Sequence, residues 1–109
     1  MFIVGQGVLG KAKFVDGVTP GYRRPYLVVD VQDDGVSILN VSTTQDKEHK
    51  LLMETNLAID NYNPPFIKPS FVKLDSKVFV SNEELSNFRL LKAGQCLNEL
   101  DLATILSKI

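Results

Sequence analysis

The stretch PYLVVDV at residues 25–31 decides the fold class, because it is apolar and rich in β-branched residues over the length of one strand. Pro25 stands at its first residue, where a missing N–H is tolerated. The turn Asp33-Asp34-Gly35 then leads into a second run of the same kind, Val36 to Val41. The spacing of the two runs predicts an antiparallel hairpin in a β-rich domain.

Further strands are predicted on both sides of this hairpin, each bounded by turn residues. The segment from Val72 to Val80 has the clearest alternation, with Val72, Leu74, Val78 and Val80 on one face and Lys73, Asp75 and Lys77 on the other. Weaker strand candidates cover residues 8–15, 51–54 and 88–93.

The C-terminal part of the chain has helical signals. Residues 81–84 (SNEE) predict a turn or a single helical turn, and Asn98 is typical of the residue that caps a helix, with Asp101 at the capping-box position. The helix would present one apolar face, formed by Leu102, Ile105, Leu106 and Ile109. Five or so short strands and a terminal helix predict one mostly-β (α+β) domain over residues 1–109, a small barrel or sandwich.

Composition narrows the class of protein. An apolar fraction of 44% in 109 residues is typical of a globular domain. The only cysteine, Cys96, cannot form an intramolecular disulfide, which fits a reducing compartment. The opening MFIV is too short for a signal-peptide core, and no apolar stretch is long enough to span a membrane. We therefore expect a cytoplasmic protein without membrane contact.

The net charge of −1 by itself argues against nucleic-acid binding. The distribution of the basic residues along the chain favours it. One short window holds Lys11, Lys13, Arg23 and Arg24 with Asp16 as its only acid, and another holds Lys68, Lys73 and Lys77 with Asp75 as its only acid. If the windows are neighbours in space, the protein has a basic face; otherwise these are scattered, solvated side chains.

Neither a metal nor a cofactor is expected. His49 is the sole histidine and lies in a charged segment, so a zinc site has too few ligands. The run GQGVLG at residues 5–10 matches a dinucleotide-binding fingerprint in letters only, because it precedes a predicted strand and opens no helix.

Three segments, in this order, resemble landmarks of the MazF/PemK family of toxins: RRPYLVV (23–29), LNVSTTQ (39–45) and KPSFVKLD (68–75). They are similar to a basic R-P strand opening, a strand ending in a hydroxyl residue, and a serine before a hydrophobic strand. The resemblance implies an SH3-like β-barrel with a short C-terminal helix, usually a homodimer. It also implies a metal-independent endoribonuclease that cleaves single-stranded RNA, the toxin of a type II toxin–antitoxin system, neutralised by a cognate antitoxin protein.

The resemblance also implies roles for single residues. RNA supplies its own nucleophile, the 2′-OH, so the protein must chiefly stabilise charge on the phosphorane, and arginine suits that task. Arg24 matches the catalytic arginine, and Thr43 matches its hydroxyl partner, with Thr44 as an alternative. RNA contacts are expected from Arg23, Lys11, Lys13, Gln45, Ser70 and Lys73.

Two interpretations without a catalytic role stay open. Arg24 could stack on Tyr22 or Tyr26 at the surface, and Thr43 could simply end a strand. The chain would then be a catalytically inactive SH3-like module that binds RNA or a protein tail, because fold alone never settles activity.

Overall fold

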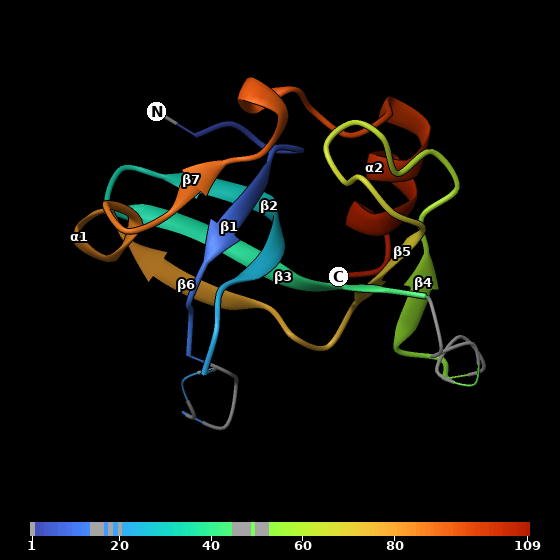
Figure 1. The fold of residues 1–109 in the computed structure, drawn as a ribbon, viewed down its shortest axis with the longest axis horizontal. Coiled ribbons are helices and arrows are strands. Elements are labelled where there is room, and N and C mark those ends of the chain that lie inside the picture. The colour runs from blue at the N-terminus through green and yellow to red at the C-terminus, as the bar shows by residue number, and fades with distance from the viewer. Residues whose placement is uncertain (1, 14–16, 18, 20, 45–48, 50–52) are drawn as a thin grey trace.

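The computed structural model describes residues 2–13, 17, 19, 21–44, 49 and 53–109, and the predicted hairpin lies at its centre (Figure 1). Strand β2 (Arg24–Gln32) pairs antiparallel with β3 (Gly35–Thr43). Both strands are nine residues long and rich in β-branched residues; β3 is buried along most of its length, whereas β2 is buried at Tyr26–Val29 and exposed at its last three residues. The hairpin prediction is confirmed.

Five shorter strands complete one antiparallel sheet with the order β4-β5-β3-β2-β1-β7, and β6 pairs with β3 beside this path. Their bounds are β1 Gly7–Gly10, β4 Asn56–Ala58, β5 Ser70–Lys73, β6 Val78–Ser81 and β7 Arg89–Leu90. The mostly-β class is therefore confirmed. Among the described strands no pairing joins β4 to β7, so the sheet is open and the closed barrel stays a prediction.

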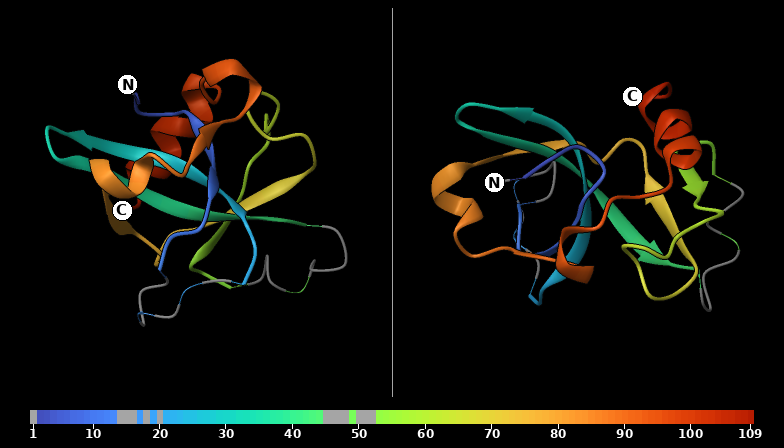
Figure 2. Two further views of the ribbon diagram at one scale, coloured as in Figure 1. Left: turned by 60° about the vertical axis from the view of Figure 1, so that its left-hand side comes forward. Right: turned by 90° about the horizontal axis from the view of Figure 1, so that it is seen from above.

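The long strand β3 supports two separate ends of the molecule. Its first half, Gly35–Ile38, pairs with β6, and its last residues, Val41–Thr43, pair with β5. Figures 1 and 2 show β1, β6, β7 and the first helix gathered at one end of the hairpin, with β4, β5 and the second helix at the other.

The prediction of one continuous strand from Val72 to Val80 is wrong. The chain turns at Ser76, whose hydroxyl donates to the carbonyl of Lys73 (2.6 Å) and accepts from the N–H of Asn40 (2.8 Å). Val72 packs in one core and Val80 in the other. Alternation continues in register across this turn, so the sequence pattern alone could not show the break.

The weaker strand predictions are partly corrected. The first strand ends at Gly10, before the predicted 8–15 is complete, and residues 14 and 15 lie outside the described part. In the predicted 51–54, residues 51 and 52 also lie outside it, and Met53 and Glu54 form a bend and turn before β4. In the predicted 88–93, only Arg89 and Leu90 are strand, followed by a tight turn at Lys92–Gly94.

Two hydrophobic cores flank the central strands. Along β2, Tyr26 and Val28 pack in the first core, whereas Leu27 and Val29 pack in the second. The same alternation holds on β3, where Ile38 belongs to the first core. Successive side chains thus point to opposite faces of the sheet, as strand geometry requires, and both faces are covered.

Two short helices have the expected caps. Ser81 and Glu84 form a capping box on α1 (Asn82–Leu85). The side chain of Asn98 accepts from two backbone N–H groups at the start of α2 (Glu99–Leu106). Asp101 departs from the prediction, because its carboxylate accepts from the N–H of Asn61 (2.8 Å) and closes no box.

Half of the predicted apolar face of the C-terminal helix packs within the chain. Ile105 is buried in the second core and Leu102 packs against it, while Leu106 and Ile109 are exposed. No helix in the described part of the chain is both long and apolar enough to cross a membrane.

Candidate functional site

Arg24 opens β2 and is half-buried. Its Nη2 atom donates to the hydroxyl of Tyr22 (2.9 Å), and its guanidinium carbon lies 4.8 Å from the centroid of the same ring. Stacking on Tyr22, one of the alternatives considered from the sequence, is therefore present. Tyr22 itself is 62% exposed, so this contact lies at the surface.

The strand register assigns further side chains to the face on which Arg24 lies. Residues paired across antiparallel strands share a face, and so do residues two apart on one strand. The pairs Tyr26 with Asn40 and Ser42 with Phe71 therefore extend this face to β3 and β5. We call it the Arg24 face; it consists of Arg24, Tyr26, Asn40, Ser42, Phe71 and Lys73.

Thr43 and Ser70 lie on the opposite face. They are paired across β3 and β5, next to the pair Val41 with Val72, which packs in the second core. Pro25 shares this face because it alternates with Arg24. The sheet thus separates the two residues predicted to act together, Arg24 and Thr43, and puts Ser42 on the side of the arginine.

On this opposite face the side chains of Thr43 and Ser70 line a cavity of about 390 Å³, which we call the groove. A row of paired residues crosses it, Pro25 opposite Leu9 and Leu9 opposite Arg89. Its described lining is Leu9, Pro25, Thr43, Pro65, Phe66, Ile67, Lys68, Ser70, Arg89, Leu91 and Lys92. The charged groups among these are all cationic, so the groove is suited to an anion with an apolar part.

One wall of the groove is a left-handed turn held by a buried glutamine. Lys92 and Ala93 have φ of 50° and 54°, a conformation that costs energy for residues other than glycine. The carboxamide of Gln6 donates to the carbonyl of Gly94 (3.0 Å) and accepts from the N–H of Ile3 (2.8 Å). Gln6 is 6% exposed, so both bonds form where water competes little.

The other wall is the segment 65–68, which approaches β1 closely. A Cβ atom on Gly7 would lie 2.8 Å from Cγ of Pro65 and 3.2 Å from Cε1 of Phe66. On the same strand, a Cβ on Gly10 would lie 2.5 Å from the ring of Phe88. Because Gly7 and Gly10 have no side chain, the groove wall and the first core can both pack closely against β1.

The hydroxyl groups near the groove differ in their bonding. The Ser70 hydroxyl donates to the carbonyl of Lys68 (2.7 Å), as expected for a strand-start serine. Thr44, the alternative to Thr43, donates its N–H to the carbonyl of Pro69 (2.9 Å), and its hydroxyl contacts the same oxygen at 3.4 Å. Thr43 and Lys68 line both the groove and an adjoining hollow of about 320 Å³.

The other predicted RNA contacts are dispersed. Lys11, Lys13 and Arg23 are exposed, and Gln45 lies outside the described residues. Lys13 and Lys77 line one hollow together with Glu84, so one lysine from each basic window of the sequence lies there beside an acid. His49 is exposed, and no group of three His, Cys, Asp or Glu side chains that could hold a metal occurs among the described residues.

Sequence reasoning missed Arg89 and Lys92 as site residues, and it placed Lys68 only in a basic window. Nothing in the local sequence marks Arg89, because its strand is two residues long. The signal comes only from pairing, since Arg89 lies opposite Leu9 across β1 and β7.

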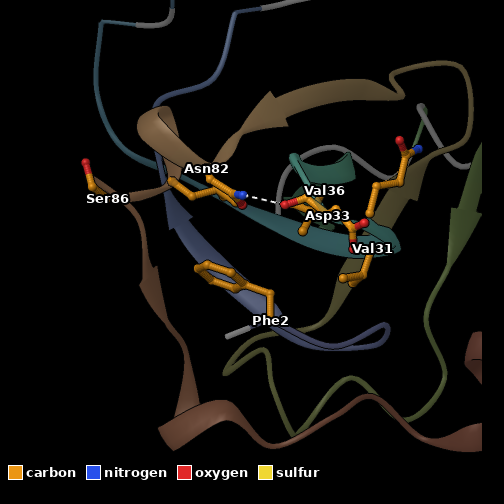
Figure 3. Close-up of a pocket in the computed structure, with 8 residues that line it drawn as sticks. Phe2, Val31, Asp33, Val36, Asn82 and Ser86 are labelled. Carbon is orange, nitrogen blue, oxygen red and sulfur yellow. Dashed lines mark hydrogen bonds between the residues drawn. The ribbon is translucent and has the colours of Figure 1, made fainter.

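A third hollow, of about 680 Å³, lies at the far end of the hairpin (Figure 3). Phe2, Val31 and Val36 contribute apolar surface there, and the Asn82 side chain donates to the carbonyl of Asp33 (2.7 Å). Its described lining contains no cation. It therefore has the wrong electrostatics for a polyanion.

Tyr26 is the group in this region whose pKa is clearly perturbed. Burial raises the pKa of its phenol, while the N–H of Ala12 bonded to its oxygen (3.1 Å) and the nearby charge of Arg24 act in the opposite direction. The phenol therefore stays protonated and neutral beside Arg24, and it contributes no negative charge to the Arg24 face.

No protein-family model matches the chain, and no curated protein matches it.

Proposed function

We propose that the chain is a metal-independent endoribonuclease that cleaves single-stranded RNA, a cytoplasmic toxin of the MazF/PemK type. The observation that carries the proposal is the Arg24 face, where two half-buried cations, Arg24 and Lys73, share one side of the sheet with the hydroxyl residue Ser42. Partly desolvated cations act on phosphate more strongly than fully hydrated ones, because the local dielectric constant is lower.

The reaction needs three things of the protein: phosphate binding, charge stabilisation and a defined geometry. The 2′-oxygen attacks the adjacent phosphorus and loses its proton to solvent. The bond to the 5′-oxygen breaks, that oxygen takes up a proton, and a 2′,3′-cyclic phosphate remains. Arg24 binds two phosphate oxygens side by side and stabilises the added negative charge, and Lys73 supplies a second charge.

The direct test is cleavage of a long RNA by purified protein in the presence of EDTA, without antitoxin. Arg24→Ala should lower the rate by about 100-fold or more, as expected for loss of one preorganised charged donor. Arg24→Lys should recover little, because a point charge cannot bind two oxygens in parallel. Arg23→Ala is the matched control, since Arg23 is exposed and precedes the strand. Intact RNA with the wild type would overturn the proposal.

One observation favours a second function, a catalytically inactive module that binds RNA. Arg24 already donates to Tyr22, and the sheet separates it from Thr43. In that case Tyr22→Phe and Arg24→Ala would both leave RNA binding intact, and no cyclic phosphate product would form. Thin-layer analysis of the products distinguishes the two functions.

The proposal includes a cognate antitoxin. An antitoxin segment that folds on binding would cover the basic surface with acidic residues. Asp33 and Asp34, exposed at the hairpin tip, should then stay outside its footprint, as should Asp46 and Glu48, which lie outside the described residues. A hydrogen-exchange footprint centred on these acids would contradict this binding mode.

A homodimer is also part of the proposal. Leu106 and Ile109, together with Leu100 at 79% exposure, are the apolar side chains that α2 and the end of the chain leave for a partner copy. Sedimentation at tens of micromolar protein should show the dimer. A monomer at that concentration would exclude it.

A further inference from the structure

The groove is a second surface lined by cations, and it lies on the opposite side of the sheet from the Arg24 face. Lys68, Arg89 and Lys92 approach it from different segments of the chain, and its described lining contains no carboxylate. Arg89 is held at a strand pairing and Lys92 by the turn that Gln6 supports. The backbone positions of Arg89 and Lys92 are therefore fixed beside the groove, and the side chains of all three cations are exposed.

The floor of the groove is apolar. Among its lining residues Leu9, Pro25 and Leu91 are half-buried, and Ile67 is 69% exposed. With a volume of about 390 Å³, the groove lies at the lower end of the usual range for small-ligand sites. An occupant with one flat apolar unit and a negative group fits this shape, and a nucleotide has that composition.

An extended peptide fits less well. A peptide that binds by strand addition needs an unpaired strand edge. Strand β1, which crosses the groove, is already paired with β2 on one side and β7 on the other. The edge strand beside the groove is β7, and its two residues, Arg89 and Leu90, are too few to pair with an extended peptide. A bound peptide would also need its own acids to match the cations, whereas every nucleotide of RNA carries a phosphate.

We infer that the groove binds a nucleotide of single-stranded RNA outside the cleaved linkage, with its base on the floor and its phosphate at Arg89, Lys68 and Lys92. The inference rests on the proposed function. Arg24 and Pro25 are consecutive residues on opposite faces, so the start of β2 is the point at which a bound strand passes from one surface to the other.

The test uses the full chain and a labelled six-nucleotide 2′-O-methyl RNA, which binds but cannot be cleaved because its nucleophile is blocked. Fluorescence anisotropy compares the wild type with Arg89→Gln, Lys92→Gln and the double variant. Lys108→Gln is the matched control: Lys108 is an exposed cation that lines none of the described cavities, and its loss changes net charge equally. Circular dichroism verifies that every variant is folded.

We expect Arg89→Gln to weaken binding by about fivefold or more and to make the slope of log affinity against log salt shallower by about one, with the double variant shallower by about two. Lys108→Gln should bind as the wild type does. With cleavable RNA, Arg89→Gln should raise KM and leave kcat unchanged, because it removes binding and no transition-state contact.

Other results overturn the inference in identifiable ways. Equal losses for Arg89→Gln and Lys108→Gln would mean diffuse electrostatic binding, and loss of self-association in Arg89→Gln would identify a second copy as the occupant. Unchanged RNA affinity in Arg89→Gln, with cleavage lost in Arg24→Ala, refutes the groove and keeps the enzyme. Groove-dependent binding without cleavage by the wild type keeps the groove and refutes the enzyme. No RNA binding at all refutes both.

Discussion

The Arg24 face and the groove lie on opposite sides of β2, β3 and β5, yet they present their cations differently. On the Arg24 face the cations are half-buried and the neighbouring aromatic residues, Tyr26 and Phe71, are fully covered. Around the groove the cations are exposed and surround an open apolar floor. The first arrangement is suited to stabilising charge at one phosphate. The second is suited to binding a further nucleotide of an RNA strand.

This comparison shows that neighbours in sequence need not share a site. Arg24 and Pro25 differ by one position, as do Ser42 and Thr43, and each pair is divided between the two faces. Consecutive residues of a sequence motif therefore point to two different faces once the motif forms a strand.

The largest difference expected between matched residues of the two faces concerns their hydroxyl groups. We expect the Ser42 hydroxyl, on a residue that is 8% exposed, to bind the phosphate on the Arg24 face, so Ser42→Ala should lower the cleavage rate by about tenfold or more. Thr43→Val keeps the side-chain shape and should leave kcat within about threefold, with any loss confined to KM. Single-turnover kinetics separates the two effects. The reverse result would mean that Thr43 reaches the cleaved phosphate and that the division between the faces is wrong.

The glycines of β1 test whether the two sides of the molecule can be disturbed separately. Gly10→Ala forces a methyl group against the ring of Phe88 in the first core and should cost about 2 kcal/mol in the free energy of unfolding. Gly7→Ala displaces Pro65 at the groove wall and should cost about 1 kcal/mol while weakening RNA binding. Urea unfolding and anisotropy measure these quantities. Equal binding losses in both variants would show that the sides are coupled.

Gln6 tests how firmly the groove wall must be held. Gln6→Ala removes the partners of the Gly94 carbonyl and the Ile3 N–H and should cost about 1–2 kcal/mol. Gln6→Glu keeps the acceptor for Ile3, loses the donor to Gly94 and buries a negative charge beside that carbonyl, so it should cost more stability than Gln6→Ala. RNA affinity should fall in both variants. If stability falls but affinity does not, the left-handed turn has no part in binding.

The smallest effect is the pH dependence of stability that arises from Tyr26. Its pKa is raised in the folded state, so its contribution is fully present below the ordinary tyrosine pKa of 10.0 and is lost as pH rises through the folded value. Unfolding free energy should therefore decline above about pH 10 more steeply in the wild type than in Tyr26→Phe. The variant itself should lose about 1 kcal/mol at neutral pH, because the Ala12 N–H loses its acceptor. Parallel curves would exclude Tyr26 as the cause.

The sequence by itself determined the elements whose signals are local. The hairpin β2–β3, the capping box of Ser81 and Glu84 and the Asn98 cap all follow from neighbouring residues, because strand alternation and helix capping act over a few positions. The sequence also singled out Arg24, which the structure shows half-buried at the start of β2.

Only the tertiary structure decided which residues share a face and a cavity. The break at Ser76, the assignment of Thr43 and Arg24 to opposite faces and the position of Arg89 at the groove depend on pairing between strands far apart in the chain. A residue's own neighbours carry no signal for such contacts, because pairing is fixed by the packing of both cores at once. The residue types therefore determine which chemical groups this protein has available. The register of the sheet determines how those groups are divided between the two surfaces.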